Sequence, residues 1–330
     1  MITNSPDTIV SHGCPCCNGG QPAVTAAAME NKQVDLHLDA AKAAAGSDLT
    51  SYLKLADATH PNANTPTIEE MMNWPAPDPG KAFDNLYFVG SRWVSAWALV
   101  TDAGIILIDT MDNDEEAEQL IEGGMRKLGL NPTDIRIILV THGHGDHYGG
   151  VNYLTNKYPA RVLMSGIDWD TVATGELEFD FPNWGRPPKR GESVSDGDIV
   201  SLGSTDVKIL LTPGHTRGTI SLLFEVHDKG QTYQGLLWGG TAFNFGNRSD
   251  RIERLNQYID STERAKVIVR DRDVQVFISN HSLFDEAVEK LKSLPHQTTN
   301  PFVMSVSDVE RALTVMEECA RATLIHWKDS

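Results

Sequence analysis

The sequence predicts an α/β fold in which helices lie outside two β-sheets. From about Leu86 onward, short apolar runs of strand length alternate with longer stretches of helix-forming residues. The chain has 330 residues, of which 40% are hydrophobic and 22% are charged, as is typical of a globular protein. No apolar run approaches the roughly 18 to 20 residues that a membrane span requires. A chain of this length can bury a large core without disulfides.

The first eighty residues differ from the rest. They open with a stretch rich in glycine, proline and cysteine, after which an alanine-rich segment from roughly Pro22 to Ala45 predicts a helix. A second, short helix is expected at Thr67, whose hydroxyl can cap it. Three prolines between Trp74 and Gly80 exclude a helix there and indicate a linker. We therefore predict a partly helical N-terminal extension over residues 1–80 and a separate domain over residues 81–330.

Beyond residue 80, apolar runs bounded by turn residues predict ten strands. They span Leu86–Val89, Ser95–Thr101, Ile105–Asp109, Ile137–Val140, Arg161–Ser165, Asp198–Leu202, Val207–Thr212, Ile220–Val226, Tyr233–Trp238 and Val274–Ser279. A helix capped by Asp114 is expected to reach about Leu128, where Gly129 ends it. Further helices are expected at about 250–270, 284–293 and 307–325.

Charge and cysteine content argue against several classes of protein. Lys and Arg number 28 and Asp and Glu number 45, which gives a formal net charge of −17, so neither nucleic acid nor an anionic membrane is an expected partner. The N-terminus lacks the basic start and apolar stretch of a signal peptide, so we expect a cytoplasmic location. Cys14, Cys16 and Cys17 crowd together and only Cys319 remains, which argues against a disulfide framework and a zinc site.

The strongest functional signal follows the apolar strand that ends at Val140. His142, His144, Asp146 and His147 fall within six residues, and glycines between them let the backbone turn tightly. Imidazole and carboxylate are ligands that suit zinc or iron, and zinc is common in hydrolytic sites. The spacing therefore predicts a metal site at the end of this strand.

Two further histidines, His215 and His281, also come directly after predicted strands. A lone histidine at a strand end usually has a structural role, but the neighbouring motif favours metal binding here. Five imidazoles and one carboxylate suffice for two metal ions with three protein ligands each. Such a site leaves an open position for water.

The motif His142-x-His144-x-Asp146-His147, then His215 in a Pro-Gly-His-Thr context, then His281, resembles the metallo-β-lactamase superfamily. The resemblance runs from about Leu86 to His281. It implies an αββα sandwich that holds two zinc ions at one edge, between the sheets. The first eighty residues are not explained by it.

The resemblance also implies a role for each residue of the motif. The first zinc ion would be held by His142, His144 and His215, and the second by Asp146, His147 and His281. Asp146 would in addition orient the nucleophile as the catalytic residue. Asp109, at the end of the strand Ile105–Asp109, would support a ligating histidine, although an acid there could also serve as a turn or helix cap.

Three positions at which the sequence differs from other family members indicate which subclass it resembles most. Gly240 stands where many family hydrolases have an aspartate that bridges the metals, and Thr241 stands where another lactamase subclass has a cysteine. A second metal site made only of Asp146, His147 and His281 resembles the third subclass of metallo-β-lactamases. Phe243 stands where those enzymes have a serine that binds the carboxylate of the drug.

Aromatic residues are candidates for a substrate pocket, with ordinary packing as the alternative. Aromatic walls favour a flat, apolar substrate. The predicted substrate-binding residues are Thr241, Phe243, Phe245, Trp93 and Trp184, with Phe181 close to Trp184 in the sequence.

Together these observations predict a dinuclear zinc hydrolase that acts on a small molecule. It would open a cyclic amide or ester, a lactam or lactone, by attack of metal-bound hydroxide. The alternatives are a β-lactamase that acts on antibiotics, an iron-dependent redox enzyme of the same superfamily, and a non-catalytic metal-binding scaffold. The substrate and the oligomeric state stay open.

Overall fold

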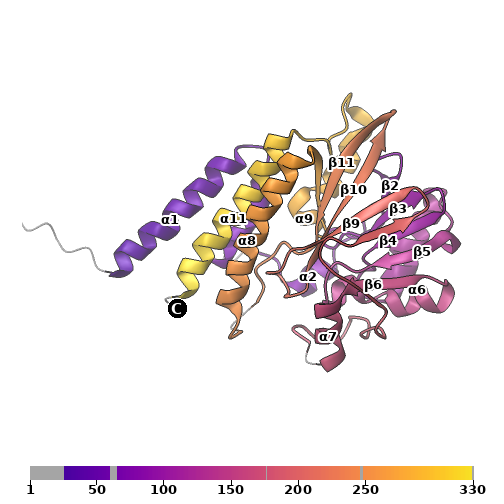
Figure 1. The fold of residues 1–330 in the computed structure, drawn as a ribbon, viewed down its shortest axis with the longest axis horizontal. Coiled ribbons are helices and arrows are strands. Elements are labelled where there is room, and N and C mark those ends of the chain that lie inside the picture. Colours follow the sequence, from indigo (N-terminus) through magenta and orange to yellow (C-terminus); the bar gives the residue numbers. More distant parts are fainter. Residues whose placement is uncertain (1–25, 60–64, 176, 246–247, 329–330) are drawn as a thin grey trace, which may run out of the picture.

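The computed structural model describes residues 26–59, 65–175, 177–245 and 248–328, with side chains from residue 32 onward. Two β-sheets pack face to face and helices cover both outer faces (Figure 1), which confirms the predicted fold class. Cys14, Cys16, Cys17 and the start of the helix expected from Pro22 lie outside the described residues. Within the described ranges, no helix combines the length and the apolar character that crossing a membrane requires.

The first sheet contains seven strands that lie side by side in chain order. The neighbours from β1 to β4 are antiparallel, and those from β4 to β7 are parallel. The strands are β1 (Gly80–Lys81), β2 (Leu86–Phe88), β3 (Trp97–Thr101), β4 (Gly104–Ile108), β5 (Ile135–Leu139), β6 (Arg161–Ser165) and β7 (Glu192–Val194).

The second sheet contains five strands in the order β12-β11-β10-β9-β8. Its neighbours are antiparallel, except that β12 runs parallel to β11. The strands are β8 (Ile199–Leu202), β9 (Thr205–Leu211), β10 (Ile220–Asp228), β11 (Gln231–Trp238) and β12 (Val274–Ser279).

Central strands read as unbroken apolar runs because both of their faces are buried. In β4, Ile106 and Ile108 point into the core between the sheets, where they meet residues such as Leu222. Ile105 and Leu107 point the other way and pack under the helices of the first outer layer. The sandwich is therefore held together by one core between the sheets and one under each helical layer.

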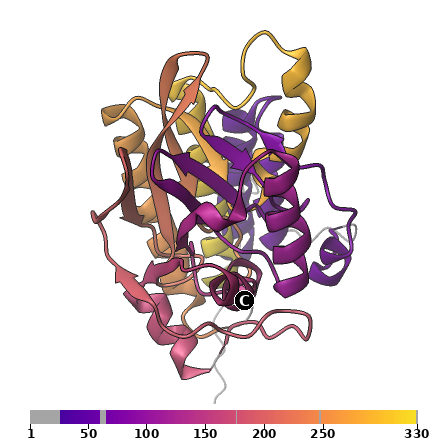
Figure 2. The ribbon, with the colours of Figure 1, turned by 90° about the vertical axis from the view of Figure 1, so that its right-hand side faces the viewer.

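One helical segment, formed by α3 (Asp114–Glu116), η2 (Ala117–Glu122) and α4 (Gly123–Lys127), lies across the outer face of the first sheet (Figure 2). The cap of this segment was predicted as Asp114, and that prediction is wrong. Asn113 is the cap, because its Oδ1 accepts a hydrogen bond from the backbone N–H of Glu116 at 3.0 Å. The same layer contains η3 (Pro132–Asp134), α5 (Gly145–Tyr148), α6 (Val151–Lys157) and α7 (Gly166–Thr174).

The second outer layer brings the start of the chain against its end. The helix α1 (Ala26–Ala45) packs along α11 (Val306–Lys328), which in turn packs on α8 (Arg251–Asp271) (Figure 1). The helices η1 (Thr50–Ala58) and α9 (Ser282–Asp285) touch each other near the end of β12. The remaining helices are α2 (Ile68–Met72), which Thr67 caps as predicted, α10 (Ala287–Ser293) and η4 (Leu294–His296).

Candidate metal centre

The candidate site lies where several strands end at one edge of the sandwich. Ile108 at the end of β4 pairs with Leu139 at the end of β5, so Asp109 lies beside the loop that carries the histidine motif. Trp238 pairs with Ser279 in the second sheet, which brings His281 to the same edge. The two sheets thereby deliver residues far apart in the sequence to one place.

A first group is formed by three histidine nitrogens. Nε2 of His142 lies 3.0 Å from Nδ1 of His144 and 3.0 Å from Nε2 of His215, and the latter two atoms are 3.1 Å apart. All three side chains are buried. The three nitrogens thus form a nearly equilateral triangle in the interior of the molecule.

The outer nitrogen of each of these histidines has its own acceptor. His142 donates from Nδ1 to the carbonyl oxygen of Gly239 at 2.8 Å, and His215 donates from Nδ1 to that of Ala242 at 2.8 Å. His144 donates from Nε2 to Oε2 of Glu178 at 3.1 Å. In a neutral imidazole the other nitrogen then carries a lone pair. Three lone pairs facing one another cannot hydrogen-bond, so this donor set fits a metal ion.

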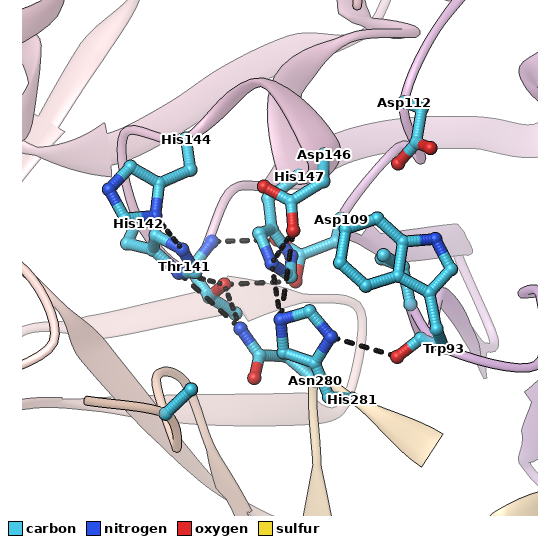
Figure 3. Close-up of polar contacts among 12 residues, drawn as sticks. Trp93, Asp109, Asp112, Thr141, His142, His144, Asp146, His147, Asn280 and His281 are labelled. Atoms are coloured by element: carbon cyan, nitrogen blue, oxygen red, sulfur yellow. Dashed lines mark hydrogen bonds and ion pairs between the residues drawn. The ribbon is translucent and has the colours of Figure 1, made fainter. Parts of the chain in front are cut away.

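A second group lies beside the first and contains Asp146, His147 and His281 (Figure 3). Nε2 of His147 lies 3.3 Å from Oδ2 of Asp146 and 3.3 Å from Nε2 of His281, and these last two atoms are 3.7 Å apart. The outer nitrogen of His147 donates to Oδ2 of Asp109 at 2.8 Å, and that of His281 donates to the carbonyl oxygen of Trp93 at 2.8 Å. This group can hold a second ion in the same way.

His142 lies close to the donor atoms of both groups. One donor atom from each of His142, Asp146 and His147 lies within 4.8 Å of the others, as holds for the three histidines of the first group. Nε2 of His142 already faces His144 and His215, so the second group is taken below as Asp146, His147 and His281.

Burial and neighbouring charges set the protonation states of these side chains. Burial, followed by the nearby histidines, lowers the pKa of His142 and His215 well below its usual value. Burial alone would raise the pKa of Asp146, but His147 and His281 outweigh it and lower the pKa. Neutral imidazole and ionised carboxylate are the forms that bind a metal, and His142, His215 and Asp146 already have them. Burial alone would lower the pKa of His147, but Asp146 and Asp109 outweigh it and raise the pKa to about 10, so metal binding there would release a proton.

Asp109 is fixed by three hydrogen bonds. Its Oδ1 accepts from the backbone N–H of Thr141 at 2.8 Å, and its Oδ2 accepts from the hydroxyl of Thr141 at 2.9 Å and from His147 (Figure 3). Its backbone has a φ of 60°, a strained conformation for a residue with a side chain. The contact with His147 places Asp109 next to the second group.

Several residues that support the site are not among those predicted from the sequence. Asn280 donates to the carbonyl oxygen of Gly239 at 2.7 Å, and its place directly before His281 was the available signal. Asp168 accepts from the backbone N–H groups of Gly143 at 2.8 Å and Gly218 at 3.0 Å, which ties two histidine loops together. Nothing in the local sequence marks Asp168 or Glu178 as part of the site.

Gly240 leaves no room for a side chain. A Cβ atom built on it would lie 2.6 Å from Cβ of His215. The position at which we expected a bridging aspartate in related enzymes is therefore closed in this backbone.

A cavity of about 600 Å³ opens onto both groups and has mainly apolar walls. Of the predicted substrate-binding residues, Trp93, Trp184 and Phe243 line it. Thr241 is buried instead, with its hydroxyl 2.9 Å from that of Ser279. Phe245 packs beneath the guanidinium of Arg254, at 4.1 Å.

The N-terminal region supplies one wall of this cavity. That wall is formed by apolar side chains from η1, α2 and the segments around them, namely Leu55, Ala58, Pro66, Ile68, Met71 and Trp74. The role of this region could not be predicted from the sequence, because nothing local links it to the histidines. Its packing against α9 and α11 brings it over the site.

Residues 91–228 match the family described as the metallo-beta-lactamase superfamily. Among solved structures, the native FEZ-1 metallo-beta-lactamase from Legionella gormanii has a TM-score of 0.66 and 26% identity, over 78% of this chain and 98% of that chain. BJP-1, a subclass B3 metallo-beta-lactamase of Bradyrhizobium japonicum, has a TM-score of 0.65 and 25% identity, over 75% of this chain and 94% of that chain.

Curated relatives include hydroxyacylglutathione hydrolases. That of Francisella tularensis subsp. novicida (strain U112) is 28% identical over 174 residues, which are 52% of this chain and 56% of the relative. That of Rhodopseudomonas palustris (strain HaA2) is 37% identical over 109 residues, which are 33% of this chain and 35% of the relative. The chain thus spans about half or less of the length of these relatives.

Proposed function

The chain contains a metallo-β-lactamase superfamily domain, and on that premise we propose that it is a hydrolase that opens a cyclic amide or ester with the help of two zinc ions. The observation that carries the proposal is the pair of donor groups at one edge of the sandwich. Each group turns three donor atoms toward a common centre, and each histidine has its other nitrogen occupied by an acceptor.

In this proposal the first ion is held by His142, His144 and His215, and the second by Asp146, His147 and His281. When bound, two zinc ions lower the pKa of a water molecule toward neutrality and polarise a carbonyl oxygen. Oδ1 of Asp146 is buried and has no hydrogen-bond partner among the described residues. This oxygen can orient the attacking water and accept its proton, which the leaving group then needs.

The cavity supports an aromatic substrate without charge. Besides the donor groups, its described lining residues include two charged side chains, Lys54 and Asp57, both on η1. The other walls are largely apolar, so a flat ring can bury its surface there while its carbonyl faces the metal groups. An aromatic lactam or lactone, including a γ-lactam, satisfies these conditions.

Hydrolysis of β-lactam antibiotics is the second candidate. The similarity to the FEZ-1 enzyme over 98% of that chain favours it. Against it, Phe243 is an apolar cavity residue at the position where we expected a serine to bind the carboxylate of the drug. A glutathione conjugate, the substrate type in the relatives' name, carries several charges that these apolar walls do not match.

The test is hydrolysis by zinc-loaded protein, with a chelated sample as the control. The panel contains an aromatic γ-lactam, an aromatic lactone, a chromogenic cephalosporin and a hydroxyacyl ester of glutathione. We expect chelator-sensitive turnover of the aromatic lactam or lactone above that of the other two. Fast cephalosporin turnover would instead support a β-lactamase, and two bound metals with no turnover of the panel would support a scaffold.

A further inference from the structure

A buried arginine connects two separate loops of the first donor group. Arg254 lies on α8 with its side chain fully buried. Its Nη1 donates to Oε1 of Glu178 at 2.7 Å, and Oε2 of the same carboxylate accepts from Nε2 of His144 at 3.1 Å. Arg248 lies nearer the surface, with its Nε 3.7 Å from Oε1 of Glu178. A chain of contacts thus runs from α8 through Glu178 to His144.

The same guanidinium reaches the loop that carries His215. Nε of Arg254 donates to the carbonyl oxygen of Gly214 at 3.0 Å, one residue before His215. Gly214 has a φ of 143°, and a Cβ atom on it would lie 2.6 Å from Cβ of Tyr258. The backbone at this point is therefore closely confined, and Arg254 fixes the direction of its carbonyl group.

The ring of Phe245 packs against the face of the Arg254 guanidinium. The carbon at the centre of the guanidinium lies 4.1 Å from the centre of the Phe245 ring. A planar cation on an aromatic face is favourable, and more so when it is removed from water. The planar guanidinium can donate hydrogen bonds to Glu178 and to the carbonyl oxygen of Gly214 at the same time. A lysine ammonium cannot do this in the same geometry.

We propose that Glu178 and Arg254 are positioning residues for the first metal group, with Arg254 orienting Glu178 and Gly214 and thereby His144 and His215. The inference rests on the proposed function, since it assumes that this group binds zinc. A carboxylate behind a ligating histidine fixes its orientation and makes its ligating nitrogen a better donor.

The support is confined to one of the two groups. The outer partners of the second group are Asp109 and the carbonyl oxygen of Trp93, which Glu178 and Arg254 do not contact. A loss of Glu178 or Arg254 should therefore weaken one metal ion and spare the other. A general loss of stability would weaken both ions together.

The experiment titrates metal-free protein with zinc against a chromophoric chelator and measures the affinity of each equivalent. The variants are Glu178→Gln and Arg254→Lys. Their matched controls are Glu263→Gln and Arg264→Lys, which change exposed ion-paired residues of the same helix α8. We expect the affinity of one zinc equivalent to fall by about 10- to 100-fold in both variants. The other equivalent and both controls should match the wild type.

The outcomes separate the inference from the proposed function. A wild-type chain that binds no zinc overturns the proposed function. If the wild type binds two zinc ions and the variants bind both with unchanged or equally reduced affinity, only the positioning role is overturned. Circular dichroism and thermal unfolding confirm that each variant is folded. If Arg254→Lys does not fold, Glu178→Gln decides alone, because glutamine keeps the shape of the side chain.

Discussion

His147 donates a hydrogen bond from Nδ1 to Oδ2 of Asp109 across 2.8 Å, with both side chains fully buried. The same carboxylate accepts two hydrogen bonds from Thr141, at the start of the histidine motif. One acid at the end of β4 therefore fixes both the loop and the orientation of a histidine in the second donor group.

Replacement of Asp109 by asparagine should weaken zinc binding at the second group by about 10- to 100-fold. An amide offers one acceptor oxygen where the carboxylate offers two, so at least one of its present donors loses its partner. Metal content after dialysis against a weak chelator measures the effect. Asp114→Asn, at an exposed position on α3, is the control. Retention of two ions by Asp109→Asn would contradict this role.

His144→Ala should abolish hydrolysis while the protein stays folded. The change removes one of the three nitrogens of the first group and leaves Glu178 with its partner Arg254. Turnover and zinc content are measured on the same sample, and circular dichroism reports the fold. Turnover at the wild-type rate in a sample of verified metal content would refute the ligand role.

Phe243→Ser should raise cephalosporin hydrolysis relative to the wild type, because a hydroxyl at the cavity wall can bind the carboxylate of the drug. The ring of Phe243 packs edge-on against Tyr258, with centroids 4.8 Å apart. Its loss should lower the free energy of unfolding by about 3 kcal/mol. Steady-state kinetics and thermal unfolding measure the two effects. No gain in cephalosporin turnover would show that residue 243 is not the anchor position.

The N-terminal wall should control which substrates fit. Met71→Ala and Trp74→Ala remove apolar surface from the cavity and should lower kcat/KM for an aromatic lactone by about tenfold. A small aliphatic lactone, which does not reach this wall, should be affected less. Glu69→Ala, an exposed change on the same helix, serves as the control. Equal losses for both lactones would argue against a role in specificity.

The parts of the fold that the sequence predicted are those encoded locally. Strands buried on both faces, such as β4 and β5, were readable because they leave unbroken apolar runs, and two short edge strands, β1 and β7, were missed because they leave no such run. The N-cap of α3 was predicted at Asp114 but is Asn113. Asparagine and aspartate are both good caps, and which of the two neighbours caps the helix depends on where the backbone becomes helical.

The candidate site was predictable where its residues cluster in the sequence. The four residues from His142 to His147 form such a cluster, and His215 and His281 gain meaning only beside it. Glu178 and Arg254 could not be found, because each is a single charged residue whose partners are set by tertiary contacts. The chain after β11 is irregular, so its sequence has no periodicity that shows which side chains face the cavity. It could not be predicted that Phe243 lines the cavity and that Phe245 packs against Arg254 instead.

We propose that one chain holds two metal ions in adjacent groups at one edge of the sandwich. The most direct measurement is a titration of metal-free wild-type protein with zinc, in competition with a chelator, that counts the tightly bound equivalents. We expect two equivalents in the wild type and the loss of tight binding at one of them in His144→Ala. A count of zero or one in the folded wild-type chain would contradict it.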